Sequence, residues 1–194
     1  MTNNLKVQGV EDFIKQWNQL AIDNGLPGIH FVAHLFSQVN QESVDKLYAM
    51  GFNAINSLGL QIAMYGVNKT VGRIKMRLNK LLGRLRRAVK YSEAYPLFIQ
   101  EIDTEENVYP SIIPNWDHTP RSGKAGTVLL NSTPSLFKNH CREILDIVKS
   151  KREENQIIFI KSWNEWGEGN YMEPDLKFGK GYIEALRSAI DETK

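Results

Sequence analysis

Two glutamates three residues apart, Glu165 and Glu168, stand out among the residues that could do chemistry. They lie in the run IIFIKSWNEWGEGNYMEPD, directly after an apolar stretch that reads as a strand, and beside Trp163 and Trp166. Two close carboxylates do not ionise independently, and aromatic neighbours favour the protonated form of the less solvated one. We therefore expect one carboxyl group to hold a proton while the other stays charged, which is the division of roles that glycosidic chemistry uses.

The same run has a second interpretation, in which it is a solvated loop whose glutamates cap the helix that follows. Loops that follow strands carry the functional residues of many α/β proteins, and this favours the first interpretation. The flat faces of tryptophans beside carboxylates also suit the apolar faces of sugar rings. The residue types and their spacing therefore predict a site that acts on a glycan.

A second dense cluster is PNWDHTPRSG at 114–123. Because it follows a predicted buried strand, we expect it at the same rim of the sheet as the glutamates. Asp117 and Arg121 could form hydrogen bonds with sugar hydroxyls, and Trp116 could stack on a sugar ring. Alternatively, Asp117 and Arg121 pair with each other and hold the loop.

His30 and His34 are four residues apart in a predicted strand, so they share one face, and only His34 is near the carboxyl end where a site would lie. Two histidines without a third ligand are a weak indication of a metal. We interpret them as core or rim residues and keep His34 as a candidate substrate contact. The sequence also lacks phosphate-loop, dinucleotide, zinc-protease and Asp-x-Asp motifs. We therefore expect no metal and no cofactor.

Hydrophobic periodicity predicts alternating strands and helices. The predicted helices are 10–24, 41–50, 134–151 and 180–190, and the predicted strands are 29–36, 52–58, 108–114 and 157–163. The nearly continuous apolar runs 108–113 and 157–160 indicate burial on both faces, as in parallel sheets. Four strand–helix units predict an α/β fold, and a complete eight-stranded barrel needs roughly 250 residues. We therefore expect half of a (β/α)8, TIM-like barrel, with an acidic linker at 101–106.

Residues 60–92 form a basic segment with nine lysines and arginines and no acidic residue. Apolar residues recur in it at three- and four-residue steps, which predicts a basic amphipathic helix or helical hairpin inserted in the domain. Residues 69–90 could lie on an anionic membrane surface, or grip the phosphates of a lipid-linked substrate or of nucleic acid. Alternatively, the segment packs on the body and exposes a solvated cationic face. No aromatic residues interleave with the charges, which disfavours nucleic acid.

Bulk composition sets outer limits. The 194 residues suffice for a single domain, 1–194, or for part of a larger one, and a net charge of +2 implies no polyelectrolyte partner. The polar N-terminus has no hydrophobic signal region, and no apolar run approaches the length of a membrane span. The single cysteine, Cys141, excludes an intrachain disulfide. We expect a cytoplasmic protein, peripheral at the inner membrane.

Three segments carry a family resemblance: YPSIIPNWDHTPRSG (109–123), NSTPSLF (131–137) and SWNEWGEGNYMEPDLKFGKGYIEAL (162–186). They closely resemble the WbsX-type glycosyltransferases, which are encoded with bacterial O-antigen and capsule assembly genes and are related to glycoside hydrolase family 99. The weaker stretches GLPG (25–28) and MGFNA (50–54) follow in the family's order. The resemblance therefore spans most of the chain.

The resemblance implies a (β/α)8 barrel that acts on a glycan without a metal. In the hydrolase relatives a Glu-Trp-x-Glu pair is catalytic, one carboxylate activating the sugar 2-hydroxyl and the other serving as acid and then base. This pair falls on Glu165 and Glu168. We expect substrate contacts from the motif residues around it, which are Trp116, Asp117, His118, Arg121, Trp163, Asn164, Trp166 and Tyr171.

Two departures from the family pattern bear on these expectations. His118 stands where most members have Asn, so we expect an altered ligand contact and a different substrate. The family's N-terminal half has no counterpart before Met1, so we expect a separate N-terminal half-barrel or self-association.

Together these patterns predict a glycosyltransferase of bacterial surface polysaccharide biosynthesis, acting in O-antigen, lipopolysaccharide or capsule assembly. Its substrate would be a glycan or a lipid-linked oligosaccharide. A glycoside hydrolase with water as final acceptor is the first alternative, and a non-catalytic glycan-binding fragment is the second.

Overall fold

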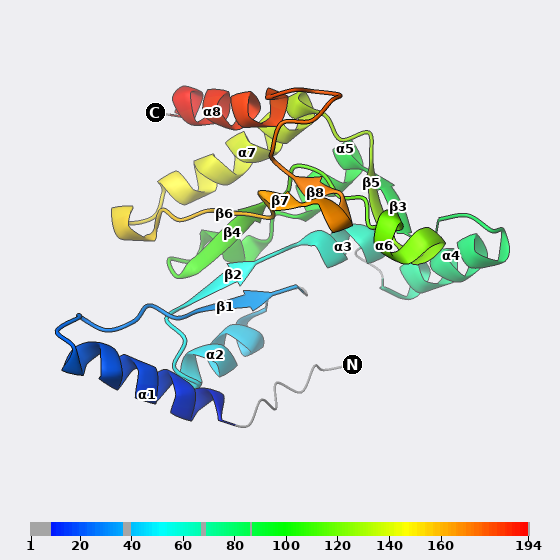
Figure 1. The fold of residues 1–194 in the computed structure, drawn as a ribbon. Coiled ribbons are helices and arrows are strands. Elements are labelled where there is room, and N and C mark those ends of the chain that lie inside the picture. Colours follow the sequence, from blue (N-terminus) through cyan, green and yellow to red (C-terminus); the bar gives the residue numbers. More distant parts are fainter. Residues whose placement is uncertain (1–8, 37–39, 67–68, 86, 194) are drawn as a thin grey trace.

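The computed structural model describes residues 9–36, 40–66, 69–85 and 87–193, and its central feature is a sheet of four parallel strands. The strands follow chain order across the sheet: β1 (Val32–Leu35), β2 (Ala54–Ser57), β4 (Val108–Ile112) and β6 (Phe159–Ile160). The sheet curls as half of a barrel (Figure 1). The predicted α/β half-barrel with four strand–helix units is therefore confirmed.

The four predicted helices are present and cover the sheet. Helices α1 (Val10–Asp23) and α2 (Gln41–Ala49) lie beside β1 and β2, whereas α7 (Pro134–Lys149) and α8 (Gly181–Thr193) lie beside β4 and β6 (Figure 1). Side-chain caps begin two of them: Asn40 accepts from the backbone N–H of Ser43, and Thr133 from that of Leu136. The observed bounds lie within three residues of the predicted ones.

Short elements connect these units, mostly at the carboxyl ends of the strands. They are α3 (Leu60–Tyr65), α4 (Lys69–Leu81), α5 (Tyr91–Ala94), η1 (Tyr95–Leu97), η2 (Glu101–Thr104), α6 (Thr119–Ser122), η3 (Gly123–Ala125), η4 (Glu153–Asn155), β7 (Asn164–Glu165), η5 (Trp166–Glu168) and β8 (Asn170–Tyr171). Within the described residues, none of the helices combines the length and the apolar character that crossing a bilayer requires.

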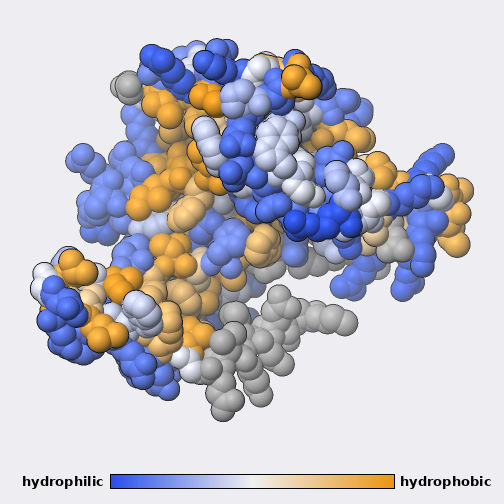
Figure 2. Space-filling model, in the orientation of Figure 1, coloured by the Kyte–Doolittle hydropathy of each residue, from blue (hydrophilic) through white to orange (hydrophobic). Residues whose placement is uncertain are grey.

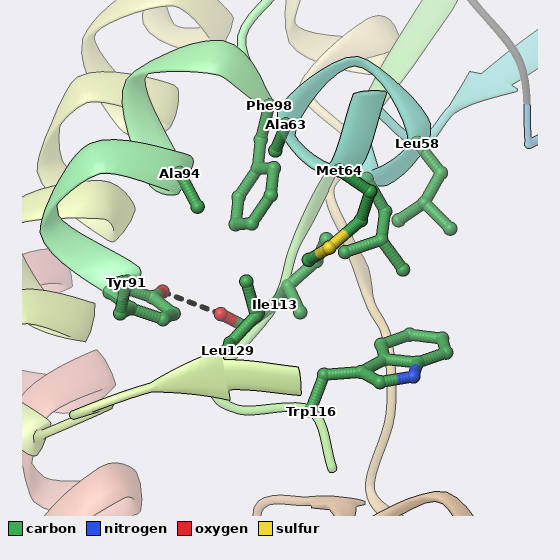
Figure 3. Close-up of a cluster of buried hydrophobic side chains, with 10 residues drawn as sticks. Leu58, Ala63, Met64, Tyr91, Ala94, Phe98, Ile113, Trp116 and Leu129 are labelled. Atoms are coloured by element: carbon green, nitrogen blue, oxygen red, sulfur yellow. Dashed lines mark hydrogen bonds between the residues drawn. The ribbon is translucent and has the colours of Figure 1, made fainter. Parts of the chain in front are cut away.

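Apolar side chains gather in three clusters. One joins α2 to β1 and β2, and a second joins α7 and α8 to β4. The third packs α3 and α5 against Ile113, Trp116 and Leu129 (Figure 3). In this cluster the buried Tyr91 hydroxyl donates to the carbonyl oxygen of Ile113 at 2.5 Å. The third cluster supports the loop that follows β4, which carries the residues 114–123.

A second parallel sheet was not predicted. It pairs β3 (Arg87–Lys90) with β5 (Thr127–Leu130). The expectation of helix through 69–90 is therefore wrong at its end: α4 stops at Leu81, and Gly83 takes a positive φ of 64°. The three- and four-residue spacing continues into β3, but pairing with a distant strand decides its structure. Arg86 and residues 1–8, which include most of the polar N-terminus, lie outside the described residues.

Two further expectations are corrected. Residues 157–160 do not form a strand buried on both faces, because Phe159 and Ile160 are 38% exposed. They lie at the edge of the sheet, where β4 is the one described strand that pairs with β6. The acidic segment 101–106 is not simply a solvated linker. Asp103 is fully buried in η2 and accepts from Ser57 Oγ at 2.5 Å, and burial raises the pKa of its carboxyl group.

Helix α7 buries one histidine, His140, completely. Its Nδ1 lies 3.1 Å from the Tyr91 hydroxyl, and its Nε2 has no hydrogen-bond partner in the described part of the chain. Burial lowers the pKa of His140 from 6.5 to about 3. The imidazole of His140 takes up a proton near pH 6.5 in the unfolded chain but stays neutral in the folded chain down to about pH 3. Lowering the pH from 6.5 toward 3 therefore favours the unfolded state.

We predict that the free energy of unfolding falls by about 2 kcal/mol between pH 7.5 and about pH 5, since protons bind the unfolded state alone at this position. The His140→Leu variant should lose most of this pH dependence, whatever its stability at neutral pH. Urea denaturation across that range measures both. His30→Gln, which removes an exposed histidine, is the control and should behave like the wild type. An unchanged pH slope in His140→Leu would contradict the prediction.

Candidate active site

The two glutamates lie on a β-hairpin that follows β6. Strands β7 and β8 pair antiparallel, with Glu165 opposite Asn170, and the short helix η5 forms the tip. Glu165 therefore ends a strand, whereas Glu168 sits on the tip. The Lys161–Ser162 peptide bond that leads into the hairpin is cis. The run after β6 is thus an ordered hairpin.

Two buried amide side chains fix this hairpin to the sheet. Asn170 donates through Nδ2 to the carbonyl oxygens of Asn115 (2.6 Å) and Lys161 (2.8 Å), and its Oδ1 accepts from Ser162 Oγ (2.8 Å). Asn115 donates to the Tyr171 carbonyl at 3.1 Å and accepts from the Tyr171 N–H at 2.9 Å. These bonds join the end of β4, the end of β6 and the hairpin into one unit.

The hairpin tip also docks on the loop that holds Asp117. The Asp117 N–H donates to the carbonyl oxygens of Glu168 (3.0 Å) and Gly169 (3.2 Å). Gly169 has a φ of +51°, and a Cβ there would lie 2.7 Å from the Asp117 carbonyl oxygen. The close approach therefore requires glycine at this position.

Arg121 joins the two glutamates. Its Nη1 donates to Glu168 Oε1 at 2.9 Å, and its Nη2 lies 3.3 Å from Glu165 Oε1. The Glu168 side chain is 20% exposed and that of Glu165 is 39% exposed, so both remain open to solvent. The guanidinium carries a positive charge between two negative ones and offsets their mutual repulsion. The predicted carboxylate pair thus shares one cation.

The alternative pair of Asp117 with Arg121 does not form. The Asp117 carboxylate instead accepts from the backbone N–H (2.9 Å) and the hydroxyl (2.6 Å) of Thr119, at the start of α6. These bonds fix the turn from which Arg121 reaches the glutamates. Asp117 is exposed, but one of its oxygens is committed to this turn.

His118 lies beside Glu168 at the same site. Its backbone N–H donates to the Thr127 carbonyl in β5, which sets its position. Its Nε2 is 3.7 Å from Glu168 Oε1, beyond hydrogen-bond distance, and forms no hydrogen bond with any residue that the structure describes. A protonated His118 would form an ion pair with Glu168. The strand that positions it, β5, was absent from the predicted elements.

Aromatic rings surround the carboxylates. Trp166 stacks on Tyr171 at 3.8 Å between ring centroids, and its Nε1 donates to Glu173 Oε2 at 2.6 Å. Trp163 and Trp166 are both about half exposed, and Asn164 between them is also exposed. The predicted tryptophans therefore keep surface available for a ligand, while one face of Tyr171 is covered by Trp166.

Trp116 is placed differently. It is only 7% exposed and belongs to the third apolar cluster (Figure 3). The Lys161 ammonium lies 5.4 Å from the centre of its ring. This position does not favour stacking of Trp116 on a sugar, and the ring instead supports the loop below Asp117.

His34 lies on the inner face of the half-barrel, in a cleft of about 270 Å³ that β6 and Lys161 also line. It is hydrogen-bonded through Nδ1 to Asn56 Oδ1, and Asn56 donates to Ser111 Oγ at 2.8 Å. No hydrogen bond or ion pair joins His34 to Glu165 or Glu168 in the part of the chain that the structure describes. Among the described residues, no group of three or more His, Cys, Asp or Glu side chains is arranged to hold a metal ion.

Sequence reasoning missed the amides and hydroxyls that build this region. Asn56 and Ser111 lie in the apolar strands β2 and β4, and Asn115 and Asn170 lie within the two motifs, where sequence analysis gave them no role. The available signal was a polar residue inside an otherwise apolar run, because a buried amide needs specific partners. Those partners are on other strands and cannot be read from spacing alone.

Comparisons with known proteins show the family and the fold of the chain. A sequence profile of the family described as Glycosyltransferase WbsX matches residues 3–186. The uncharacterized protein WxcX of Xanthomonas campestris pv. campestris, in two strains, is 31% identical over 84 residues, which are 43% of this chain and 12% of WxcX. A solved structure, a glycoside hydrolase-like protein, has a TM-score of 0.59 at 13% identity and covers 93% of this chain.

The proteins that this chain matches are longer than the chain itself. The chain spans 49% of the glycoside hydrolase-like chain, and the segment aligned with WxcX is about an eighth of WxcX. At 13% identity the structural likeness shows the fold alone. That fold is the one predicted from the alternation of strands and helices.

We predict that Asn170→Ala destabilises the protein by about 2–4 kcal/mol, because it leaves buried carbonyl oxygens of Asn115 and Lys161 without donors. Asn164→Ala, on the exposed side of the same hairpin, is the matched control and should change stability by less than about 0.5 kcal/mol. Chemical denaturation measures both. Equal effects of the two substitutions would show that the amide does not hold the hairpin.

Proposed function

The chain belongs to the WbsX glycosyltransferase family, and we propose that it transfers a glycosyl unit in bacterial surface polysaccharide biosynthesis, with Glu165 and Glu168 as the catalytic pair. The family and the fold together support a carbohydrate-active enzyme. One observation carries the proposal for the pair. Each glutamate contacts Arg121 through Oε1, and the Oε2 of each accepts no hydrogen bond from the described residues. Two carboxylate oxygens are therefore available to one substrate.

The proposed chemistry needs no metal. One carboxylate takes a proton from the sugar hydroxyl next to the anomeric carbon, and the oxygen of that hydroxyl bonds to the anomeric carbon as the glycosidic bond breaks and the other carboxylate donates a proton to the leaving oxygen. In the second step the acceptor oxygen bonds to the anomeric carbon and its proton goes to the second carboxylate. The bond made in the first step breaks, and the first carboxylate returns its proton to the sugar oxygen. Arg121 keeps the two groups at a fixed spacing throughout, and proper positioning contributes strongly to such reactions.

The substrate we propose is a glycan, free or linked to a lipid. Trp163 and Trp166 offer half-exposed aromatic surface beside the carboxylates for the apolar face of a sugar ring. Asn164, His118 and the uncommitted oxygen of Asp117 offer hydrogen-bonding groups near the pair. The cleft that His34 lines would receive a more distant sugar. The same proposal places the reaction in the cytoplasm.

Hydrolysis is the second candidate function, favoured by the likeness to a glycoside hydrolase-like fold. The same pair would serve, with water in place of the acceptor hydroxyl. A glycan-binding role without catalysis would use only the tryptophans. Incubation with lipid-linked and free oligosaccharides separates these functions, since transfer extends a product, hydrolysis shortens it, and binding alone changes neither.

We predict that Glu165→Gln and Glu168→Gln each lower turnover by about 10²–10⁴-fold, because each removes one proton-transfer group. Because the two groups act on one bond, the double variant should lose less than the product of the single losses. Glu173→Gln is the matched control: this glutamate binds the Trp166 indole, so we expect a smaller effect. Near wild-type turnover in both single variants would rule the catalytic assignment out.

The roles of the two glutamates can be told apart with an activated substrate. A nitrophenyl glycoside needs little protonation of its leaving group, so only the variant that lacks the acid should recover glycosyl release on it. Circular dichroism of each variant checks that the fold is kept. If neither variant responds to the leaving group, the division into acid and base is wrong.

We also propose that a second four-strand unit, in the same polypeptide or in another, covers the open sheet. Apolar side chains are exposed at both ends of it: Phe13, Trp17 and Leu20 on α1 beside β1, and Phe159 and Ile160 on β6. Figure 2 shows hydrophobic side chains exposed at the place of α1. Open strand edges recruit partners.

For the chain alone we expect self-association that increases with concentration. Phe13→Gln with Trp17→Gln should weaken it, because these side chains are half-exposed and apolar, while Leu176→Gln, at a fully exposed position, should not. Light scattering during size-exclusion chromatography measures the mass of each. A wild-type chain that stays monomeric at every concentration would refute this proposal.

A further inference from the structure

Helix α4 presents its apolar residues to solvent. Four of them are between 53% and 82% exposed, namely Val71, Ile74, Leu78 and Leu81, and Leu82 directly after the helix is 63% exposed. The three- and four-residue steps between the four place them on one side of the helix. A surface helix usually turns this side toward the core, but in α4 these residues are exposed.

The same helix is strongly basic. Arg73, Lys75, Arg77, Lys80 and Arg84 are exposed, and no acidic residue occurs between 60 and 92. Within the described part of the chain, none of these five forms an ion pair. The helix therefore combines uncompensated positive charge with an apolar stripe. Figure 2 shows hydrophilic and hydrophobic side chains next to each other at its place.

The orientation of α4 is fixed by its other side. A Cβ at Gly72 would lie 2.0 Å from the Tyr65 carbonyl oxygen, so the helix contacts α3 through this glycine. From α4, the residues Val71, Gly72, Lys75, Met76 and Asn79 line a cavity of about 360 Å³ between α4, α3 and β3. Apart from Val71 at its margin, the apolar stripe does not line this cavity, and turning the helix to bury the stripe would break the contact at Gly72.

The C-terminal end of α4 lies next to the candidate active site. A Cβ at Gly83 would lie 3.7 Å from the Lys124 ammonium. Lys124 belongs to η3, which directly follows the short helix α6 that carries Arg121. Figure 1 shows α4 beside α6. A surface that binds α4 would therefore lie near the rim that carries the glutamates.

We propose that α4 docks the protein on the surface of an anionic lipid bilayer. The apolar stripe would enter the boundary between headgroups and acyl chains, and the lysines and arginines would bind the lipid phosphates. An anionic bilayer offers both an apolar region for the stripe and phosphate groups for the cations of this helix. Residues 69–85 contain no aromatic side chain on which a nucleic-acid base could stack. The inference does not depend on the proposed catalytic pair.

Vesicle sedimentation with the full chain tests the proposal. We expect binding to vesicles of phosphatidylcholine with phosphatidylglycerol and little binding to phosphatidylcholine alone. Raising the salt from about 0.1 M to about 1 M should weaken binding, because the screening length falls from about 10 Å to about 3 Å. Lys75→Gln with Lys80→Gln should weaken binding at least about tenfold. Lys15→Gln with Lys180→Gln removes the same charge elsewhere and should change it little.

The apolar side needs its own variant. Leu78→Ser with Leu81→Ser changes exposed positions, so the fold should survive, as circular dichroism can check, while vesicle binding falls. Equal binding to neutral and anionic vesicles, no binding, or equal losses in both lysine pairs would overturn the proposal. The proposal would also be overturned if the wild-type chain self-associates and the Leu78→Ser, Leu81→Ser double variant is monomeric, because α4 would then be a protein interface.

Discussion

The candidate site depends on two buried amides, Asn115 and Asn170. A hairpin of two two-residue strands has little stability of its own. Here its backbone is bonded to the end of β4 through Asn115, and Asn170 bonds the ends of β4 and β6 to each other. Because a satisfied buried polar network leaves little freedom, this arrangement fixes the backbone of the hairpin that carries Glu165 and Glu168. The position of the carboxylates is thus set by the sheet.

Arg121 completes this constraint from the other motif. It is held by a turn that Asp117 caps, and the turn is placed by pairing of the loop with β5. The resulting group has two carboxylates and one guanidinium, with His118 beside Glu168. Both carboxylates stay accessible to a ligand while their repulsion is partly offset. An acid and a base that act on one bond need this combination of proximity and access.

The sequence was most informative where a pattern reflects local physics. The periodic helices, the buried strand at 108–112 and the glutamates after β6 were all predictable. The exposure of Phe159 and Ile160, the strand β5 and the sharing of Arg121 were not. Each of these depends on contacts between distant segments. Strand β6 is exposed because it pairs with β4 at the edge of the sheet, and β5 forms by pairing with β3. Arg121 is shared through salt bridges between two loops. Residue spacing contains no information on such partners.

The central claim is that Glu165 and Glu168 face one bound sugar. A crystal structure of the protein with an oligosaccharide tests it most directly. The geometry predicts a sugar ring against Trp163 or Trp166, with its glycosidic oxygen and a neighbouring hydroxyl within hydrogen-bond distance of the two carboxylates. A sugar bound elsewhere, with both glutamates still paired only to Arg121, would contradict it.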